Sequence, residues 1–194
     1  MPITELLDEL RVEFVRHGRN VDRHLEPGLS RDELVERVRS LEMTLPDDLI
    51  EMYAWRNGQG ADAEMSPDAF AFRDNAFVDV DGVLREYPLI QEYHAPEPDA
   101  VPYGFDLEKV FPFAAFMGSS LVVVCGPHTL ASPHPNPVAS VHQGVDLFFH
   151  SLESMLRTCL EWIRHPGWTT SSLLPDQAER EIWFRHNPGV FEDR

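Results

Sequence analysis

Apolar residues in the first part of the chain recur every three or four positions, which is the spacing of one face of a helix. The pattern covers residues 3–16 and returns after Ser30, where Glu33 completes the sequence of a capping box. It predicts two amphipathic helices, and the buried face of the second is expected to include Val35. Each helix needs a partner surface, because one of its sides is apolar.

The stretch from Leu45 to Gly60 predicts a third helix with defined ends. Pro46 suits the first turn of a helix, where a missing N–H costs nothing, and Asp47-Asp48 place negative charge near the positive end of the helix dipole. Asn57-Gly58 is expected to end the helix, because both residue types tolerate the left-handed conformation. No strand pattern occurs before Gly60, so three helices are expected to precede the sheet.

Strand patterns begin after Gly60. Residues 69–80 predict a short hairpin, and residues 81–93 predict a helix that is broken or kinked by Pro88. Four nearly uncharged runs then predict neighbouring antiparallel strands within 110–116, 121–125, 137–142 and 145–150. The run from Leu121 to Cys125 shows no alternation of apolar and polar residues, which favours a central strand covered on both faces.

The C-terminal quarter returns to a helical pattern. A helix is predicted from Ser151 to about residue 163, and residues 175–186 predict a last helix. Trp168 and Trp183 lie in this final segment, where they most simply anchor it onto the domain. The whole pattern predicts an α+β fold with N-terminal helices, a predominantly antiparallel sheet of about 4–6 strands, and a C-terminal helix packed on the sheet.

Length and composition favour a single domain. A chain of 194 residues with 43% hydrophobic content can bury one large core, so one domain over residues 1–194 is expected. Residues 1–29 add the N-terminal helix and residues 166–194 form an extension. The two cysteines are far apart and lie in apolar runs, so buried free thiols in a reducing compartment are expected. The chain has no long apolar segment and no leader pattern, which indicates a cytoplasmic protein.

The charge of the chain is strongly acidic and unevenly distributed. The net charge is −17, which argues against binding to nucleic acids or to an anionic membrane. Residues 61–109 hold 12 acidic and 3 basic residues, so −9 of the −17 falls in this one segment. A local field of this kind attracts a cationic partner, although an acidic surface also serves solubility alone.

Four histidines near the C-terminal strands are the sharpest hint of catalysis. His128, His134, His142 and His150 lie close in sequence, which leaves open a small metal-dependent enzyme. Their spacing, however, matches no metal-ligand motif. Cys125 and His128 are a conceivable nucleophilic pair, but a cysteine that ends an apolar strand is typical of core packing. The sequence therefore predicts no catalytic residue, no metal site and no cofactor.

Three segments, in this order, resemble the SUKH superfamily, which includes the Smi/Knr-type regulators and bacterial immunity proteins. The segments are residues 45–58, 110–124 and 146–156. The first is similar to the family's leucine-proline helix followed by an asparagine-glycine step. The second is similar to its hydrophobic-proline-phenylalanine strand with the partner strand, and the third to its last strand with the serine-led helix that begins here at Ser151. The resemblance covers about residues 30–165, and it implies that these residues form the core of a single SUKH-like domain.

This resemblance implies a binding protein without catalytic activity. The family has no shared catalytic residues, and its bacterial members bind and neutralise toxin domains. We therefore expect an immunity protein that masks a cationic toxin domain; a regulatory or scaffold protein of the Smi/Knr type, with an endogenous partner, is the alternative. The residues expected to steer and engage the partner are Glu64, Asp68, Asp74, Asp79 and Asp81.

Overall fold

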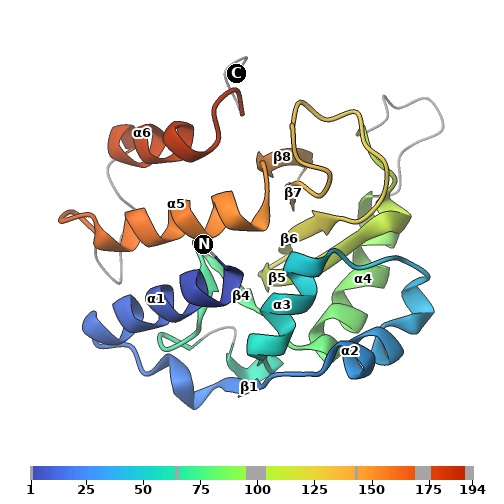
Figure 1. Cartoon of the computed structure of the whole chain (residues 1–194), viewed down its shortest axis with the longest axis horizontal. Helices are drawn as coiled ribbons and strands as arrows, with labels where there is room; N and C mark the ends of the chain where they lie inside the picture. Colours follow the sequence, from blue (N-terminus) through green and yellow to red (C-terminus); the bar gives the residue numbers. More distant parts are fainter. Residues whose placement is uncertain (1, 64–65, 95–103, 143, 169–175, 191–194) are drawn as a thin grey trace.

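The computed structural model describes residues 2–63, 66–94, 104–142, 144–168 and 176–190. Within these ranges the protein consists of six α-helices and an antiparallel six-stranded sheet, and a short two-stranded sheet lies beside them, so the predicted α+β fold is confirmed. Figure 1 shows the helices packed around the large sheet. None of the helices in the described ranges is long and apolar enough to cross a membrane.

The N-terminal helices form as their patterns predict. Their bounds are α1 Ile3–Arg16, α2 Arg31–Arg37 and α3 Asp47–Trp55, with 3-10 turns at Val21–Arg23, Arg39–Leu41 and Ala61–Ala63. The expected capping box starts α2: the Ser30 hydroxyl accepts from the Glu33 N–H, and the Glu33 carboxylate accepts from the Ser30 N–H. The prediction for Val35 is wrong, because α2 turns this residue toward solvent, where it stays 48% exposed.

The segment after α3 differs from the prediction. The helix ends at Trp55, and the next residues form strand β2 (Arg56–Gln59), which pairs antiparallel with β1 (Leu25–Pro27). The prediction of no strand before Gly60 is therefore wrong. Gly58 has a left-handed φ of +67°, but it adopts this conformation within the strand and not at a helix end. The reason is tertiary, because Gly58 passes so close to the backbone of Val78 that no side chain fits.

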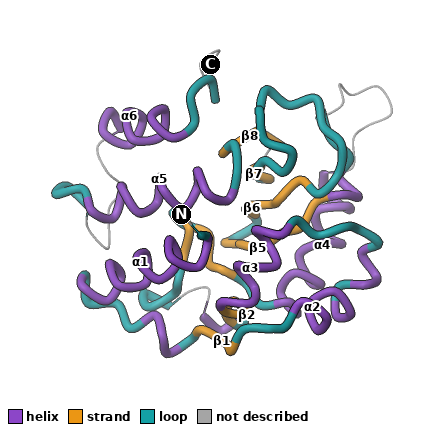
Figure 2. Tube along the Cα trace, viewed as in Figure 1, coloured by secondary structure: helices purple, strands orange, loops and turns teal. Residues whose placement is uncertain are grey.

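The six-stranded sheet follows the order of the chain. Its strands are β3 Ala71–Phe72, β4 Asn75–Phe77, β5 Val110–Phe116, β6 Ser119–Val124, β7 Val138–Val141 and β8 Val145–Phe149. Each strand pairs antiparallel with the next, which confirms the hairpin arrangement predicted from the short connections (Figure 2). Helix α4 (Val80–His94) and the 3-10 turn Leu107–Lys109 connect β4 to β5. Pro88 lies within α4, and the helix continues through it without a break.

Two helices complete the fold: α5 (Leu152–Arg164) and α6 (Asp176–His186). Ser151 caps α5 through a capping box, as predicted. Figure 1 shows α5 between α1 and α6, and it contacts both. The predicted anchoring role of Trp183 is confirmed, because its ring is buried and stacks on Phe149 with 4.6 Å between the ring centroids. Trp168 is partly buried and meets His17 of α1 edge to face.

Strand β6 is buried on both faces, as its uninterrupted apolar run predicts. Leu121 and Val123 belong to the larger core, together with residues of α1, α3 and α5. Val122 and Val124 belong to a smaller core that also contains Ile90 of α4. Successive side chains of a strand point to opposite faces, so one run of apolar residues contributes side chains to both cores.

A buried ionic contact joins α1 to α5. Glu13 is 5% exposed, and its carboxylate accepts hydrogen bonds from Arg164 at 2.8 Å and from Arg16 at 2.9 Å. Burial raises the pKa of Glu13, but the two arginines outweigh burial and hold the pKa below its usual value. The folded state therefore gains stability from ionised Glu13 above the usual glutamate pKa, and this gain is lost as the pH falls through the lowered pKa.

Replacing Glu13 with glutamine is expected to lower the free energy of unfolding by about 1–3 kcal/mol at neutral pH, because charged hydrogen bonds are lost. The loss should shrink at a pH below the lowered pKa, since protonation removes the same interactions from the wild-type protein. Urea denaturation at both pH values measures the change in the free energy of unfolding. The control is Glu26→Gln in β1, where the side chain is exposed and little change is expected. An equal loss at both pH values for Glu13→Gln would contradict the ionic account.

Candidate functional site

The acids that the sequence singles out for partner binding include two that make hydrogen bonds to the backbone. Asp68 is partly buried, and its Oδ1 accepts from the Asn20 N–H at 2.8 Å, just before the first 3-10 turn. Asp79 immediately precedes α4, and its Oδ1 accepts from the Gly82 N–H at 2.6 Å. Asp79 therefore caps this helix.

Two other predicted acids form ion pairs. Oδ1 of Asp81 lies 2.7 Å from Nη2 of Arg37, which joins α4 to α2. Asp74, in the turn between β3 and β4, lies 3.8 Å from Nε of Arg73, and Arg73 also pairs with Glu179 of α6. The side chains of Asp81 and Asp74 remain 66% and 58% exposed, so water screens both pairs and a partner can compete for them.

The predicted acids do not gather into one site. Asp79 and Asp81 share the start of α4 near α2, whereas Asp74 lies beside a residue that contacts α6. Figure 1 shows α2 and α6 at opposite corners of the molecule. Asp68 lies apart from both, beside the first 3-10 turn, and Glu64 lies outside the described residues. Partner binding by these five residues remains a prediction.

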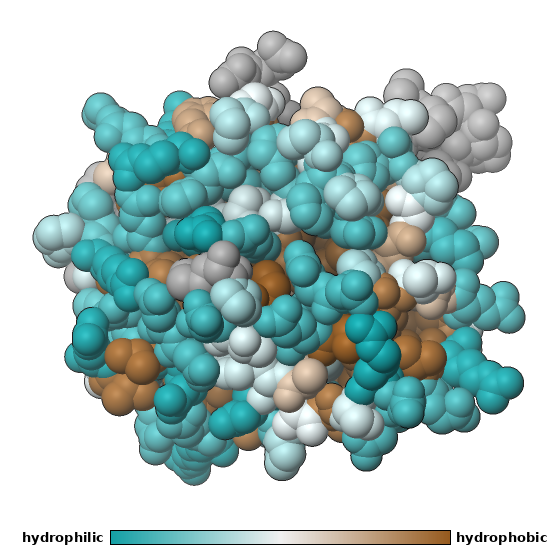
Figure 3. All heavy atoms as spheres, in the orientation of Figure 1, coloured by the Kyte–Doolittle hydropathy of each residue, from teal (hydrophilic) through white to brown (hydrophobic). Residues whose placement is uncertain are grey.

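A cleft of about 510 Å³ lies where α3 and α5 begin. Its lining includes Leu45 and Pro46 before α3, Val123 of β6, Leu152 of α5, and His134 from the loop between β6 and β7. Figure 3 shows hydrophobic surface near the centre of this face, over the region where α3 and α5 begin in Figure 1, with hydrophilic side chains around it. The cleft therefore combines segments that are more than a hundred residues apart in the chain.

Asp48 is the carboxylate of the cleft that folding leaves without a partner. It lies in the first turn of α3 and is partly buried. Its carboxylate makes no hydrogen bond and no ion pair with any residue that the structure describes. Its neighbour Asp47 differs, because Oδ1 of Asp47 lies 2.6 Å from Nη2 of Arg31. The two adjacent aspartates therefore have different roles.

The surroundings of Asp48 disfavour its negative charge. Burial raises the pKa of Asp48, and a protonated His134 opposes this shift. The negative charges of Glu51, Glu153 and Asp47 raise the pKa further. A carboxyl group with a raised pKa in a cleft is a feature that often marks a functional site.

Hydrogen bonds hold the loop that carries His134. Nδ2 of Asn136 donates to the carbonyl oxygen of Val124 at 3.0 Å, and the Asn136 N–H donates to Nδ1 of His134 at 3.4 Å. Nε2 of His128 lies 3.0 Å from the carbonyl oxygen of His134. These contacts fix one wall of the cleft against the end of β6.

The four histidines that suggested an enzyme lie at separate contacts. Besides the His128 contact, His142 lies 3.5 Å from the carbonyl oxygen of Gly118, and His150 lies 2.8 Å from that of Pro188. Across the part of the chain that the structure describes, no three His, Cys, Asp or Glu side chains are grouped so that they could hold a metal ion. The imidazoles of His128, His142 and His150 instead contact backbone carbonyls, and that of His134 accepts from the Asn136 N–H.

Burial makes both thiols poor nucleophiles. It raises the pKa of Cys125 and of Cys159 to about 12. Both cysteines are free, as predicted; Cys159 is buried and Cys125 is partly buried. Because the thiolate is the reactive form of cysteine, the pair of Cys125 and His128 is not an activated nucleophile.

The fold and the cleft define an α+β domain with a partly charged cleft where two helix starts meet a central strand. No model of a known protein family matches the chain, and no curated protein matches it either. Sequence reasoning missed Asp48 as a site residue, because an acid in a first helical turn is explained by the helix dipole alone. The signal that the sequence does offer is a second acid beside Asp47.

Proposed function

We propose that this protein is a non-enzymatic binding domain of the SUKH type, and that it acts as an immunity protein against a cationic toxin domain. The observation that carries the proposal is that all three segments that resemble the family contribute to the cleft. Leu45 and Pro46 come from the first segment, Val123 from the second and Leu152 from the third. A binding role shared by a family is expected where its shared segments meet, because function resides in sites and not in the fold as a whole.

The charge of the protein supports a cationic partner. The net charge is −17, and an acidic field of this size speeds the encounter with a basic protein and makes it sensitive to salt. Glu64, Asp68, Asp74, Asp79 and Asp81 are proposed to provide part of this field. Long-range attraction needs no direct contact, so it is compatible with the internal hydrogen bonds and ion pairs of these acids.

The experiment that tests the proposed function uses the toxin candidate encoded by an adjacent gene. Cells that express this candidate are expected to die, to survive when the protein is co-expressed, and to yield a complex of the two proteins. Survival without a complex would contradict direct masking. A neighbouring gene without toxicity, together with an endogenous protein as the bound partner, would favour the regulatory or scaffold role of the Smi/Knr type.

Replacing Asp74 and Asp81 together with asparagine is expected to slow association with the toxin roughly threefold to tenfold at low salt. The dissociation rate should change little, because exposed charges act mainly during the encounter. Stopped-flow fluorescence measures both rates. The difference from the wild-type protein should vanish at high salt, where exposed charges are screened. Equal association rates at low salt would remove the electrostatic part of the proposal.

A further inference from the structure

We propose that the cleft at the starts of α3 and α5 binds one protonated basic side chain, with the carboxylate of Asp48 as its charge partner. The assignment rests on the proposed function for the source of this side chain, which is a partner protein. The cleft volume of about 510 Å³ lies within the range of roughly 300–1,000 Å³ that is typical of ligand sites. An arginine at the centre of an interface is a common anchor of binding energy.

Asp48 is placed to receive a cation. Its carboxylate is partly removed from water, lines the cleft, and makes no hydrogen bond or ion pair with a described residue. A charge that is partly buried and makes no ion pair is unfavourable. A cation that enters the cleft would form the ion pair that Asp48 lacks in the folded chain. Asp47 and Asp79 lack this property, because Asp47 pairs with Arg31 and Asp79 caps α4.

The helix starts at the cleft do not make it an anion site. A free helix N-terminus attracts anions, because its first N–H groups point outward. In α3, however, the first turn already contains Asp47 and Asp48. In α5, the hydroxyl of Ser151 accepts from the backbone N–H of Ser154 in a capping box. The two carboxylates at the start of α3 and the capped start of α5 therefore disfavour an anion in the cleft.

The other charged groups near Asp48 determine how binding depends on pH. They come from each element packed against the cleft: Asp47 and Glu51 of α3, Glu153 and its partner Arg157 of α5, Arg31 of α2, and His134 of the loop. As the pH falls, Asp48 loses its charge, and this loss weakens the binding of a cation. Because burial raises the pKa of Asp48, the weakening begins at a higher pH than for an exposed aspartate.

The apolar part of the cleft suits a long basic side chain. Leu45, Pro46, Val123 and Leu152 offer surface for the methylene stem, while the charged end reaches Asp48. A planar guanidinium can also direct two N–H groups to one carboxylate, which a lysine ammonium does less well. An arginine is therefore expected to bind more tightly than a lysine.

An NMR titration of the full ¹⁵N-labelled chain tests this inference without any toxin. The probes are N-acetyl-arginine methylamide and the corresponding lysine, citrulline and glutamate compounds; citrulline has the shape of arginine without its charge. The arginine and lysine probes are expected to shift the amide signals of residues that line the cleft, and the citrulline and glutamate probes are not. The shifts should weaken as the pH is lowered.

Asp48→Asn preserves the shape of the side chain and removes its charge, so it is expected to weaken binding of the arginine probe about tenfold or more. The matched control is Glu26→Gln, which removes an exposed acid from β1, beside the strand that follows the other end of α3. This control should bind the probe as the wild-type chain does. The comparison of the four probes on the wild-type chain does not depend on the folding of either variant.

Three results would overturn the inference: cleft shifts with the glutamate probe in place of the arginine probe, equal binding of the arginine probe to Asp48→Asn and to the wild-type chain, or no shift with any probe up to its solubility limit. The outcomes also separate this inference from the proposed function. A toxin that is neutralised although the arginine probe does not bind would remove the role of the cleft alone. Probe binding without neutralisation of a toxin would remove the immunity role alone.

Discussion

Replacing Gly58 with alanine is expected to lower the free energy of unfolding by about 2–5 kcal/mol. Two effects add up: alanine disfavours the left-handed backbone conformation of this residue, and its Cβ atom clashes with a neighbouring backbone. A Cβ atom on Gly58 would lie 2.2 Å from the carbonyl oxygen of Val78. That carbonyl is held in place, because the buried hydroxyl of Tyr53 donates to it at 3.0 Å. Urea denaturation followed by circular dichroism measures the loss.

Gly18 provides the matched control for this experiment. It also has a positive φ, +82°, but a Cβ atom there would meet nothing within 4 Å. Gly18→Ala is therefore expected to lower the free energy of unfolding by about 1–2 kcal/mol, which is the effect of the left-handed backbone alone. Equal losses for the two variants would show that the contact between Gly58 and Val78 is loose, against the prediction.

Replacing Trp183 with alanine is expected to lower the free energy of unfolding by about 3–5 kcal/mol, because a large buried ring is removed. Trp183 is 6% exposed, and its ring centroid lies 4.6 Å from that of Phe149 and 4.3 Å from that of Phe148. These contacts join α6 to β8. Urea denaturation gives the change in the free energy of unfolding, and hydrogen exchange of the α6 amides shows whether this helix opens before the rest.

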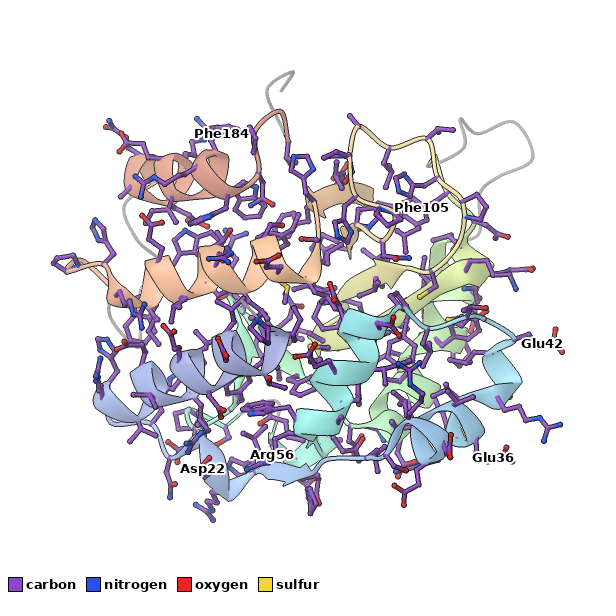
Figure 4. The ribbon with its side chains drawn as sticks, viewed as in Figure 1. Asp22, Glu36, Glu42, Arg56, Phe105 and Phe184 are labelled. Carbon is purple, nitrogen blue, oxygen red and sulfur yellow. The ribbon has the colours of Figure 1, made fainter. Side chains whose placement is uncertain are left out.

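Phe184 is the control on the same helix. It is partly exposed, and Figure 4 shows it on the side of α6 that faces away from α5. Phe184→Ala is expected to lower the free energy of unfolding by about 1 kcal/mol or less. It also removes an aromatic ring, but this ring is less buried than that of Trp183. If Trp183→Ala lowers the free energy of unfolding by no more than Phe184→Ala does, the aromatic contacts with β8 do not hold α6 on the domain.

Much of the fold could be predicted because its signals are local. The spacing of apolar residues in α1 places one face against the core, whatever the rest of the chain does. Ser30 and Ser151 satisfy the first N–H groups of α2 and α5 from within four residues. Strands β5 and β6, and strands β7 and β8, are joined by connections short enough to make each pair antiparallel.

Strand β2 could not be predicted, because the contacts that hold it come from residues twenty or more positions away. Asn57-Gly58 is as compatible with the end of a helix as with a sharp bend in a strand. The folded chain holds this segment against the start of α4: Oδ1 of Asn57 accepts from the Val80 N–H at 3.2 Å, and the Asp79 N–H donates to the Gln59 carbonyl at 3.1 Å. Local preferences carry no information about these partners.

The candidate site was beyond sequence reasoning for the same kind of reason. Charge density directs attention to residues 61–109, where the predicted acids that the structure describes have partners within the chain. Asp48 lies outside that segment and becomes distinctive only through what surrounds it. Its neighbours His134 and Leu152 come from the β6–β7 loop and from the start of α5, both distant from Asp48 in the chain.

The sequence by itself determined the α+β class, the capped helix starts, the doubly buried central strand and the acidic charge. Each of these depends on periodicity or on hydrogen bonds that span a few residues. The tertiary structure alone decided that Gly58 crosses Val78 inside a strand and that Asp47 is paired while Asp48 is not. Close approach and charge pairing depend on groups distant in the chain, and only packing brings these groups together.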